Sequence, residues 1–260
     1  MRVVYGVNPV RELLRVTGKA KARGEDVSEL WLAQGGSRAA AFGELKRLGR
    51  EAGAKIREAP REQLERLAGT DRHQGVVAVV ADYRYADLDE VLAGPSAAKP
   101  LVVVLDGVED PHNLGAIVRS SLALGASGVV IPRDRAAGVT PAVAKASAGA
   151  VERCPIARVV NVAKTLESLG ERGLWSVALT ADGERPLEEI DLTGPVALVL
   201  GSEGEGIRPL VRRGCDFSAR IPMMGATESL SVSATAAVAL YEAARQRGRR
   251  SGETHGDLPT

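Results

Sequence analysis

From Leu101 onward, short apolar runs alternate with segments of helical spacing, and this alternation limits the fold more than any other feature of the chain. The apolar runs cover residues 101–107, 128–133, 154–159, 174–180, 195–203 and 218–223. Segments of helical spacing follow them at residues 114–124, 140–149, 161–170, 206–213 and 229–247. Nearly continuous apolar strands are covered on both faces, and strands that alternate with helices favour parallel pairing. The pattern predicts an α/β domain built on a parallel sheet.

The front of the chain has a different pattern, typical of a small α+β domain. Strands are predicted at residues 27–34, 54–59 and 75–84, and helices at 9–16, 39–53 and 61–69. Asn8 and Pro9 have the residue types of a helix cap and a first helical position. Residues 82–99 are rich in Ala, Pro, Gly and Ser, which favours a linker with one helical turn. The expected organisation is a domain over 1–81, a linker over 82–99, a second domain over 100–248 and a disordered polar tail over 249–260.

Charge is distributed unevenly between these parts. Residues 1–85 carry 16 Lys and Arg against 11 Asp and Glu, whereas residues 86–260 carry 18 against 22. A basic front domain can bind a polyanion, although an excess of this size also occurs as ordinary surface scatter. Seven of its cations are candidate phosphate contacts: Lys19, Lys21, Arg23, Arg38, Lys46, Arg47 and Arg50.

Several classes of protein are disfavoured by composition. No apolar run approaches the roughly 20 residues of a membrane helix, and the start of the chain lacks the pattern of a signal peptide. Cys154 and Cys215 are far apart, and neither has a Cys or His neighbour at metal-ligand spacing. We therefore expect a cytoplasmic protein with free thiols, no membrane contact and no metal.

The first motif is DGVEDPHNLGAIVRSS, residues 106–121, which follows an apolar strand. It lacks the G-x-G-x-x-G of a dinucleotide site, and its carboxylates would repel a pyrophosphate. A Rossmann-type oxidoreductase is therefore disfavoured. Asn113 has the position of a helix cap, and Arg119 follows among apolar neighbours. Arg119 is either a surface arginine or a cleft-lining cation that needs an anionic partner.

The second motif, ALVLGSEGEGI, spans residues 197–207 and places a glycine-rich loop after a buried strand. Such loops form ligand sites in α/β sheets. The carboxylates of Glu203 and Glu205 disfavour a phosphate but tolerate a neutral or cationic ligand such as a sulfonium. The alternative is a flexible solvent-exposed turn.

The third motif, IPMMGATESLSVSATAAVALYEAAR, spans residues 221–245 and leads into a long helix rich in small residues. Small side chains allow another element to approach the helix closely. The alternative is an ordinary capped helix packed on the sheet.

Taken in order and spacing, the three motifs resemble those of the SpoU (TrmH-type) family of RNA ribose 2′-O-methyltransferases. The front domain, with YGVNPVRELL and HQGVVAVV, resembles the RNA-binding domain of the branch that acts on large-subunit ribosomal RNA. The resemblance implies a SPOUT-type α/β trefoil-knot domain, a homodimer with its active site between subunits, and S-adenosyl-L-methionine as methyl donor. The implied activity is 2′-O-methylation of a ribose, most directly at a guanosine of 23S ribosomal RNA.

The resemblance also assigns roles to individual residues. Arg119 matches the catalytic arginine of the family, and the other matching polar positions are Asn113, Glu203 and Ser229. The positions that match donor contacts are Thr180, Ala181, Gly201, Ile221, Leu230 and Ser231. Ser231 departs from the family pattern SLNVS, because it replaces the asparagine. Serine is shorter and lacks the two-ended amide, so this change predicts reduced turnover.

Two chemical roles are open for Arg119. A general base must be neutral, whereas arginine is cationic at neutral pH, so we also expect it to stabilise the developing alkoxide and to bind the adjacent phosphate. The 2′-hydroxyl requirement favours RNA over DNA. A tRNA substrate and a non-catalytic RNA-binding ribosome-assembly factor are the competing interpretations.

Overall fold

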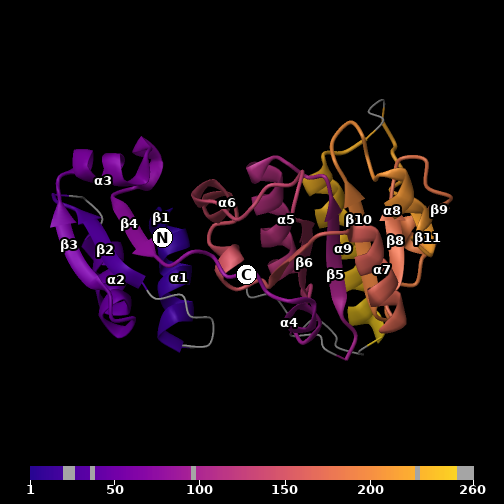
Figure 1. The fold of residues 1–260 in the computed structure, drawn as a ribbon, viewed down its shortest axis with the longest axis horizontal. Coiled ribbons are helices and arrows are strands. Elements are labelled where there is room, and N and C mark those ends of the chain that lie inside the picture. The colour runs from indigo at the N-terminus through magenta and orange to yellow at the C-terminus, as the bar shows by residue number, and fades with distance from the viewer. Residues whose placement is uncertain (20–26, 36–38, 95–97, 226–228, 251–260) are drawn as a thin grey trace, which may run out of the picture. The chain divides into compact units, whose positions relative to one another are not determined.

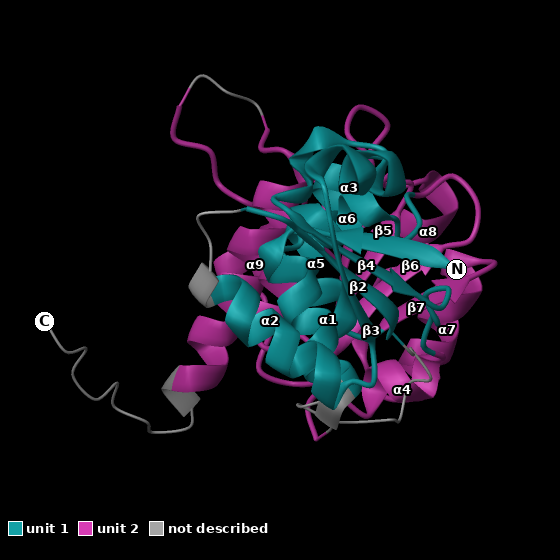
Figure 2. Cartoon of the chain, turned by 90° about the vertical axis from the view of Figure 1, so that its left-hand side faces the viewer, with its two compact units in different colours: residues 1–86, 110–119, 137–155 teal, residues 87–109, 120–136, 156–260 magenta. Residues whose placement is uncertain are grey.

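The structure is a computed structural model that describes residues 1–19, 27–35, 39–94, 98–225 and 229–250. These residues form two compact units, which Figure 2 colours separately. Unit 1 comprises residues 1–86, 110–119 and 137–155, and unit 2 comprises residues 87–109, 120–136 and 156 onward. The division does not follow the predicted domains alone, because unit 1 also includes residues 110–119 of the first motif and residues 137–155.

Unit 1 contains a four-stranded sheet in the order β1-β4-β2-β3 (Figure 1). Its strands are β1 (Arg2–Tyr5), β2 (Val27–Ala33), β3 (Lys55–Ala59) and β4 (Val76–Val80). Strand β4 is antiparallel to β1 and β2, and β2 is parallel to β3. Its helical elements are α1 (Val7–Lys19), α2 (Ala39–Glu51), α3 (Arg61–Ala68), η2 (Asp71–His73), α6 (Pro141–Ala146) and η3 (Ala150–Glu152).

Unit 2 contains a seven-stranded sheet in the order β7-β6-β5-β10-β8-β11-β9, and each neighbouring pair is parallel. The strands are β5 (Leu101–Asp106), β6 (Gly128–Pro132), β7 (Ile156–Val159), β8 (Trp175–Leu179), β9 (Arg185–Pro186), β10 (Val196–Gly201) and β11 (Phe217–Arg220). Its helical elements are α4 (Leu88–Leu92), α7 (Val162–Glu171), η4 (Leu187–Glu189), α8 (Pro209–Arg213) and α9 (Val232–Arg250). All residues of β5 and β6 are buried. The predicted α/β class and parallel sheet are confirmed.

Helix α5 (Pro111–Ala123) begins in unit 1 and ends in unit 2. It starts before Asn113, and the Asp110 carboxylate accepts a hydrogen bond from the His112 N–H at 3.0 Å. The prediction that Asn113 caps this helix is therefore wrong, because Asn113 lies inside the first turn, whereas Asp110 precedes it and accepts from one of its free amides.

Other element boundaries differ from the predicted ones for local reasons. Helix α1 begins at Val7, so Asn8 lies inside its first turn rather than at its cap. The helix predicted over 140–149 ends earlier, at Ala146, because Ala148 and Gly149 have φ angles of 52° and 90°, and η3 begins only at Ala150. Helix α4 occupies the predicted helical turn of the linker. The predicted tail lies outside the described residues from position 251 onward.

The described ranges lack two features. None of the helices there has the length and apolar content needed to cross a membrane. No group of three or more His, Cys, Asp or Glu side chains gathers in these ranges as a metal site does. Both cysteines are free. Burial, together with the nearby carboxylates of Asp216 and Asp106, raises the pKa of Cys215 to about 12, so its thiol is protonated at neutral pH.

Candidate functional site

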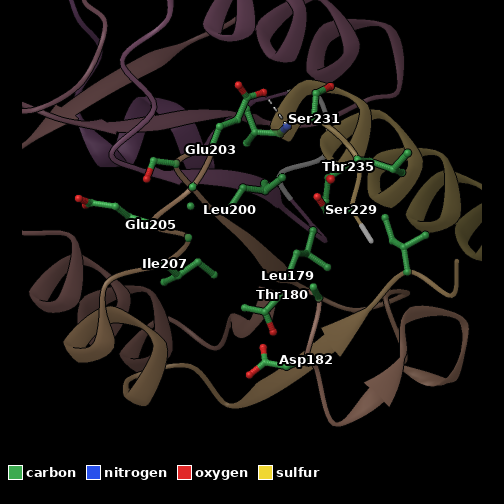
Figure 3. Close-up of a pocket in the computed structure, with 18 of the residues that line it drawn as sticks. Leu179, Thr180, Asp182, Leu200, Glu203, Glu205, Ile207, Ser229, Ser231 and Thr235 are labelled. Carbon is green, nitrogen blue, oxygen red and sulfur yellow. Dashed lines mark hydrogen bonds between the residues drawn. The ribbon is translucent and has the colours of Figure 1, made fainter. Parts of the chain in front are cut away.

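A pocket of about 580 Å³ opens in unit 2 at the C-terminal ends of β8 and β10 (Figure 3). Its lining comes from the loop after β8, from residues 200–207 after β10, and from the segment leading into α9. In open parallel sheets, ligands bind outside the carboxyl ends of the strands. The volume lies within the range of small-molecule sites, about 300–1,000 Å³.

Eight of the ten site residues predicted from the sequence line this one pocket. They are Thr180, Ala181, Gly201, Glu203, Ile221, Ser229, Leu230 and Ser231. Their positions span more than fifty residues of sequence, so the fold brings the second and third motifs together. Thr227 and Glu228 of the third motif lie outside the described residues. The lining also includes Asp182, Glu205 and Arg212, which the sequence analysis did not assign to a site. The only sequence signal for Asp182 was its place just after an apolar strand.

The glycine-rich loop after β10 is a closed turn. Ser202 and Gly206 exchange two backbone hydrogen bonds, each 3.1 Å long. Gly204 and Gly206 have φ angles of 96° and 69°, which favour glycine. A Cβ at Gly201 would lie 2.0 Å from the carbonyl carbon of Gly206 and 2.2 Å from the Ile207 nitrogen. Only glycine therefore lets the chain fold back across the end of β10 and present backbone groups to the pocket.

A buried ion pair fixes the far end of this loop. Asp106 ends β5 beside Gly201, and its side chain is fully buried. Its carboxylate accepts hydrogen bonds from the Arg208 backbone N–H and from Nε, both at 2.8 Å. Asp106 in turn raises the pKa of the Arg208 guanidinium. Asp106 belongs to the first motif, where its charge disfavours a phosphate. Through Arg208 it also holds the loop of the second motif in place.

We expect Asp106→Asn to destabilise unit 2, because the amide cannot accept both hydrogen bonds and leaves Arg208 poorly neutralised. The free energy of unfolding should fall by about 1–3 kcal/mol, which denaturant titration measures. Glu109→Gln is the matched control. It removes the same charge, but from an exposed side chain of the same turn. Equal effects of the two substitutions would contradict the positioning role of Asp106.

The pocket has an acidic character. Three of its described lining residues are carboxylates, Asp182, Glu203 and Glu205, against one guanidinium, that of Arg212. Arg212 donates to Asp182 at 3.0 Å, and this hydrogen bond lowers the pKa of Asp182, so that carboxylate is ionised at neutral pH. Such a lining suits a neutral or cationic ligand and opposes a polyphosphate.

Glu203 and Ser231 both act at the start of α9. The Val232 N–H donates to Glu203 at 3.4 Å, shown as the dashed line in Figure 3, and the Ala234 N–H donates to Ser231 Oγ at 3.3 Å. Ser231 is therefore the helix cap, and serine caps a helix about as well as asparagine. The departure from SLNVS keeps the helix start and shortens only the reach into the pocket.

Arg119 and Asn113 are not among the residues that line the pocket. Both lie on α5 in the part that belongs to unit 1. Leu114, Ile117 and Val118 bury the apolar face of this helix, which leaves Arg119 exposed. Within the described ranges, its guanidinium has no hydrogen-bond or ion-pair partner. Of the two alternatives left open for Arg119, the structure of a single chain shows the exposed one, and the side chain is available to an anionic ligand.

Comparison with known families accounts for both parts of the chain. The sequence model of the SpoU rRNA methylase family matches residues 100–241. The chain belongs to this family. A second model, for the substrate-binding domain of RNA 2′-O ribose methyltransferases, matches residues 3–86. The SpoU match includes the first two motifs in full and residues 221–241 of the third.

Two relatives named as 23S rRNA methyltransferases match three quarters or more of this chain. The 23S rRNA (guanosine-2′-O-)-methyltransferase RlmB of Pseudomonas syringae pv. tomato is 43% identical over 251 residues, which cover 95% of this chain and 96% of that protein. The RlmB of Ralstonia nicotianae is 48% identical over 197 residues, or 75% of this chain and 79% of that protein. Both are similar to this SpoU family member across its two parts.

A solved structure gives the same result for the fold. The SpoU methyltransferase AviRb from Streptomyces viridochromogenes, crystallised with AdoMet, matches with a TM-score of 0.79 at 28% identity. The match covers 96% of this chain and 91% of that one. The SpoU fold predicted from the three motifs is thereby confirmed.

Proposed function

We propose that this chain transfers a methyl group from S-adenosyl-L-methionine to the 2′-hydroxyl of a ribose in RNA, and that its substrate is a guanosine of 23S ribosomal RNA. The observation that carries the proposal is the single pocket in which the second and third SpoU motifs meet. The RlmB relatives, named for this reaction, match over both the catalytic and the substrate-binding regions.

The pocket fits the donor in shape and in charge. Only glycine at position 201 lets residues 202–206 close against the end of β10, and this packing holds the backbone of the loop at the pocket wall. Leu179, Leu200 and Ile221 supply apolar contacts for an adenosine, and the surrounding carboxylates suit a sulfonium and an ammonium group. The bound donor supplies an electrophilic methyl group on a positively charged sulfur.

The residues of this chain then have three tasks. The pocket holds the methyl carbon in line with the ribose oxygen, which is a large part of the catalysis in such a reaction. In methyl transfer the C–O bond would form as the C–S bond breaks, the donor would leave as a neutral thioether, and the hydroxyl proton would pass to solvent, or to Arg119 if that residue acts as the base. We assign Arg119 to that oxygen, where its cation stabilises the developing alkoxide and binds the adjacent phosphate. Asn113 and Ser229 are assigned to positioning the ribose.

The quaternary structure and the chain topology are part of the same proposal. Arg119 has no described partner in one copy of the chain, and we propose a homodimer in which the site is completed between subunits. Apolar side chains exposed on α9, Val238 and Tyr241, support such an interface. We also propose the trefoil knot of the SPOUT fold in the region after β10, and a cytoplasmic location, where the RNA substrate and two free cysteines fit.

We expect Tyr241→Glu to convert the homodimer to monomers, because the side chain is 61% exposed in one copy and a carboxylate there opposes burial against a second copy. Sedimentation at fixed protein concentration measures the change in mass, and methylation assays should show activity falling in parallel. Glu171→Gln, which alters charge at the end of α7 rather than on α9, serves as control. A Tyr241→Glu protein that still sediments as a dimer would place the interface elsewhere.

The function is tested by incubating the protein with ribosomal RNA that lacks the modification and with isotopically labelled donor, followed by mass spectrometry of the nucleosides. We expect labelled 2′-O-methylguanosine. Label in tRNA but not in ribosomal RNA would show that the substrate is tRNA and overturn the assignment of 23S ribosomal RNA. Donor binding without label in any RNA would favour the non-catalytic RNA-binding factor.

A further inference from the structure

Unit 1 contains a second pocket, of about 730 Å³, that shares no lining residue with the pocket of unit 2. It lies where the end of β2, the segment Asp71–Gly75 and helix α6 meet. Its described lining residues are Ala33, Gln34, Gly35, Phe42, Arg61, Asp71, Arg72, Gln74, Gly75 and Lys145. The family motif HQGVVAVV begins at this pocket, and the methyl-transfer proposal leaves that motif without a role.

The HQG segment is held in a fixed, unusual conformation. Gln74 has a φ of 57°, in the left-handed region that side chains other than glycine rarely adopt. His73 is fully buried, and its Nδ1 accepts a hydrogen bond from the Gly75 N–H at 3.0 Å. A Cβ at Gly75 would lie 3.1 Å from the Phe42 ring, so glycine admits that ring to the pocket wall. The backbone conformation of Gln74, the hydrogen bond to His73 and the packing of Phe42 on Gly75 therefore fix the turn without a ligand.

A second family motif, YGVNPVRELL, packs against the same turn. The Gln74 side-chain oxygen accepts a hydrogen bond from the Val7 N–H at the start of α1, at 3.0 Å. A Cβ at Gly6 would lie 2.6 Å from Lys145 Nζ and 3.1 Å from Gln74 Oε1. Glycine at position 6 therefore leaves room for the ammonium group of Lys145 beside the turn. Three separate segments of sequence converge here.

The lining has a net positive charge. Arg61, Arg72 and Lys145 face one carboxylate, Asp71. Burial and the neighbouring Arg61 lower the pKa of His73, so that ring is neutral and adds no charge at neutral pH. Arg61 also forms an ion pair with Glu65 at 3.5 Å and donates to the Asp71 carbonyl oxygen at 3.3 Å.

The chemistry of this lining matches a nucleotide more closely than a free anion. Guanidinium and ammonium groups bind phosphate, and an aromatic ring stacks on a base. The amides of Gln34 and Gln74 and the backbone at Gly35 add hydrogen-bonding groups of the kind that read base edges in unpaired RNA.

We propose that this pocket binds one unpaired nucleotide of the RNA substrate, with Arg72 and Lys145 on its phosphate and Phe42 against its base. The proposal rests on the assignment of RNA as substrate and adds the site at which unit 1 recognises it. It makes residues 71–75 and α6 a recognition element separate from the donor pocket.

The test compares Arg72→Glu and Phe42→Leu with the matched control Arg66→Glu, which carries the same charge change on the exposed side of α3 outside the pocket. The full chain is titrated with a fluorescent fragment of 23S ribosomal RNA over a range of salt concentrations. We expect the Kd to rise about tenfold or more for both pocket variants. Arg72→Glu should also lower the salt slope by about 0.7. Donor affinity, measured by calorimetry, and kcat at saturating RNA should stay within twofold of the wild type. The loss of activity should therefore appear as a higher KM for RNA.

The outcomes separate the pocket from the proposed function. If the wild type binds the RNA fragment but methylates nothing, the binding comparison still decides the pocket. If Arg66→Glu weakens RNA binding as much as Arg72→Glu, general charge explains the effect and the pocket proposal is overturned. An unchanged Kd for Phe42→Leu and Arg72→Glu, in proteins whose thermal unfolding matches the wild type, also overturns it.

Discussion

Replacing Arg119 by alanine should lower kcat for RNA methylation roughly 100- to 1,000-fold while S-adenosylmethionine still binds with wild-type affinity. The size of the loss is that of removing a cation or donor aimed at a developing oxyanion. Donor affinity should persist because Arg119 does not line the donor pocket. The fold should persist as well, since an exposed side chain without a described partner contributes within about 0.5 kcal/mol of stability. Single-turnover transfer of labelled methyl groups and donor calorimetry measure the two quantities.

Arg119→Lys separates the two chemical roles that the sequence leaves open. Lysine keeps a cation but not the planar fork that binds a phosphate with two hydrogen bonds. If Arg119 stabilises the alkoxide as a cation, the lysine variant should retain more activity than the alanine variant. Joint loss of donor binding and activity in Arg119→Ala would indicate a structural role and end the catalytic assignment.

The long strands of the parallel sheet were predictable because their pattern depends on burial alone, whereas β1 (Arg2–Tyr5) was missed. A strand covered on both faces is apolar at nearly every position, and β5, with all six residues buried, is the clearest case. Strand β9 was not predictable, since Arg185–Pro186 is too short to show a period. The start of α5 was misplaced because Asn113 and Asp110 are both cap-forming residue types, and only backbone geometry decides between them.

The donor pocket was predictable only through the family resemblance and the glycine pattern. Periodicity locates the end of β10, but it does not say that residues near Ser231 meet that end. The pair formed by Asp106 and Arg208 was missed for the same reason, because its members are 102 positions apart and neither lies in an unusual local pattern. Contacts of this range follow from the order of strands in the sheet, which places β5 beside β10.

The pocket of unit 1 was missed because its components look ordinary one at a time. Gln74 is an unremarked polar residue in sequence, and its φ of 57° appears only in the structure. Lys145 lies far along the chain from the HQG motif, yet it belongs to the same compact unit. The charge excess of residues 1–85 pointed correctly to a basic unit but not to a particular surface.

Replacing Gly201 by alanine should abolish donor binding, because the added methyl group has no room. It would meet the backbone of Gly206 and Ile207 at 2.0–2.2 Å, and backbone cannot rotate away as a flexible side chain can. The closed turn from Ser202 to Gly206 would have to open, which also costs its two hydrogen bonds. We expect the Kd for S-adenosylmethionine to rise at least about 100-fold and the free energy of unfolding to fall by about 1–3 kcal/mol. Calorimetry and denaturant titration measure the two effects.

Gly170→Ala is the control, because it makes the same substitution at a position where the added methyl group has room. Gly170 lies in α7, and a Cβ there has no heavy atom within 4 Å. Alanine in a helix should raise stability by about 0.5–1 kcal/mol and leave donor affinity unchanged. Wild-type donor affinity in Gly201→Ala would mean that the closed turn does not hold the donor. A protein that keeps its fold but loses the donor would instead locate methyl-donor recognition in the backbone at the end of β10, where the turn can close only because position 201 has no side chain.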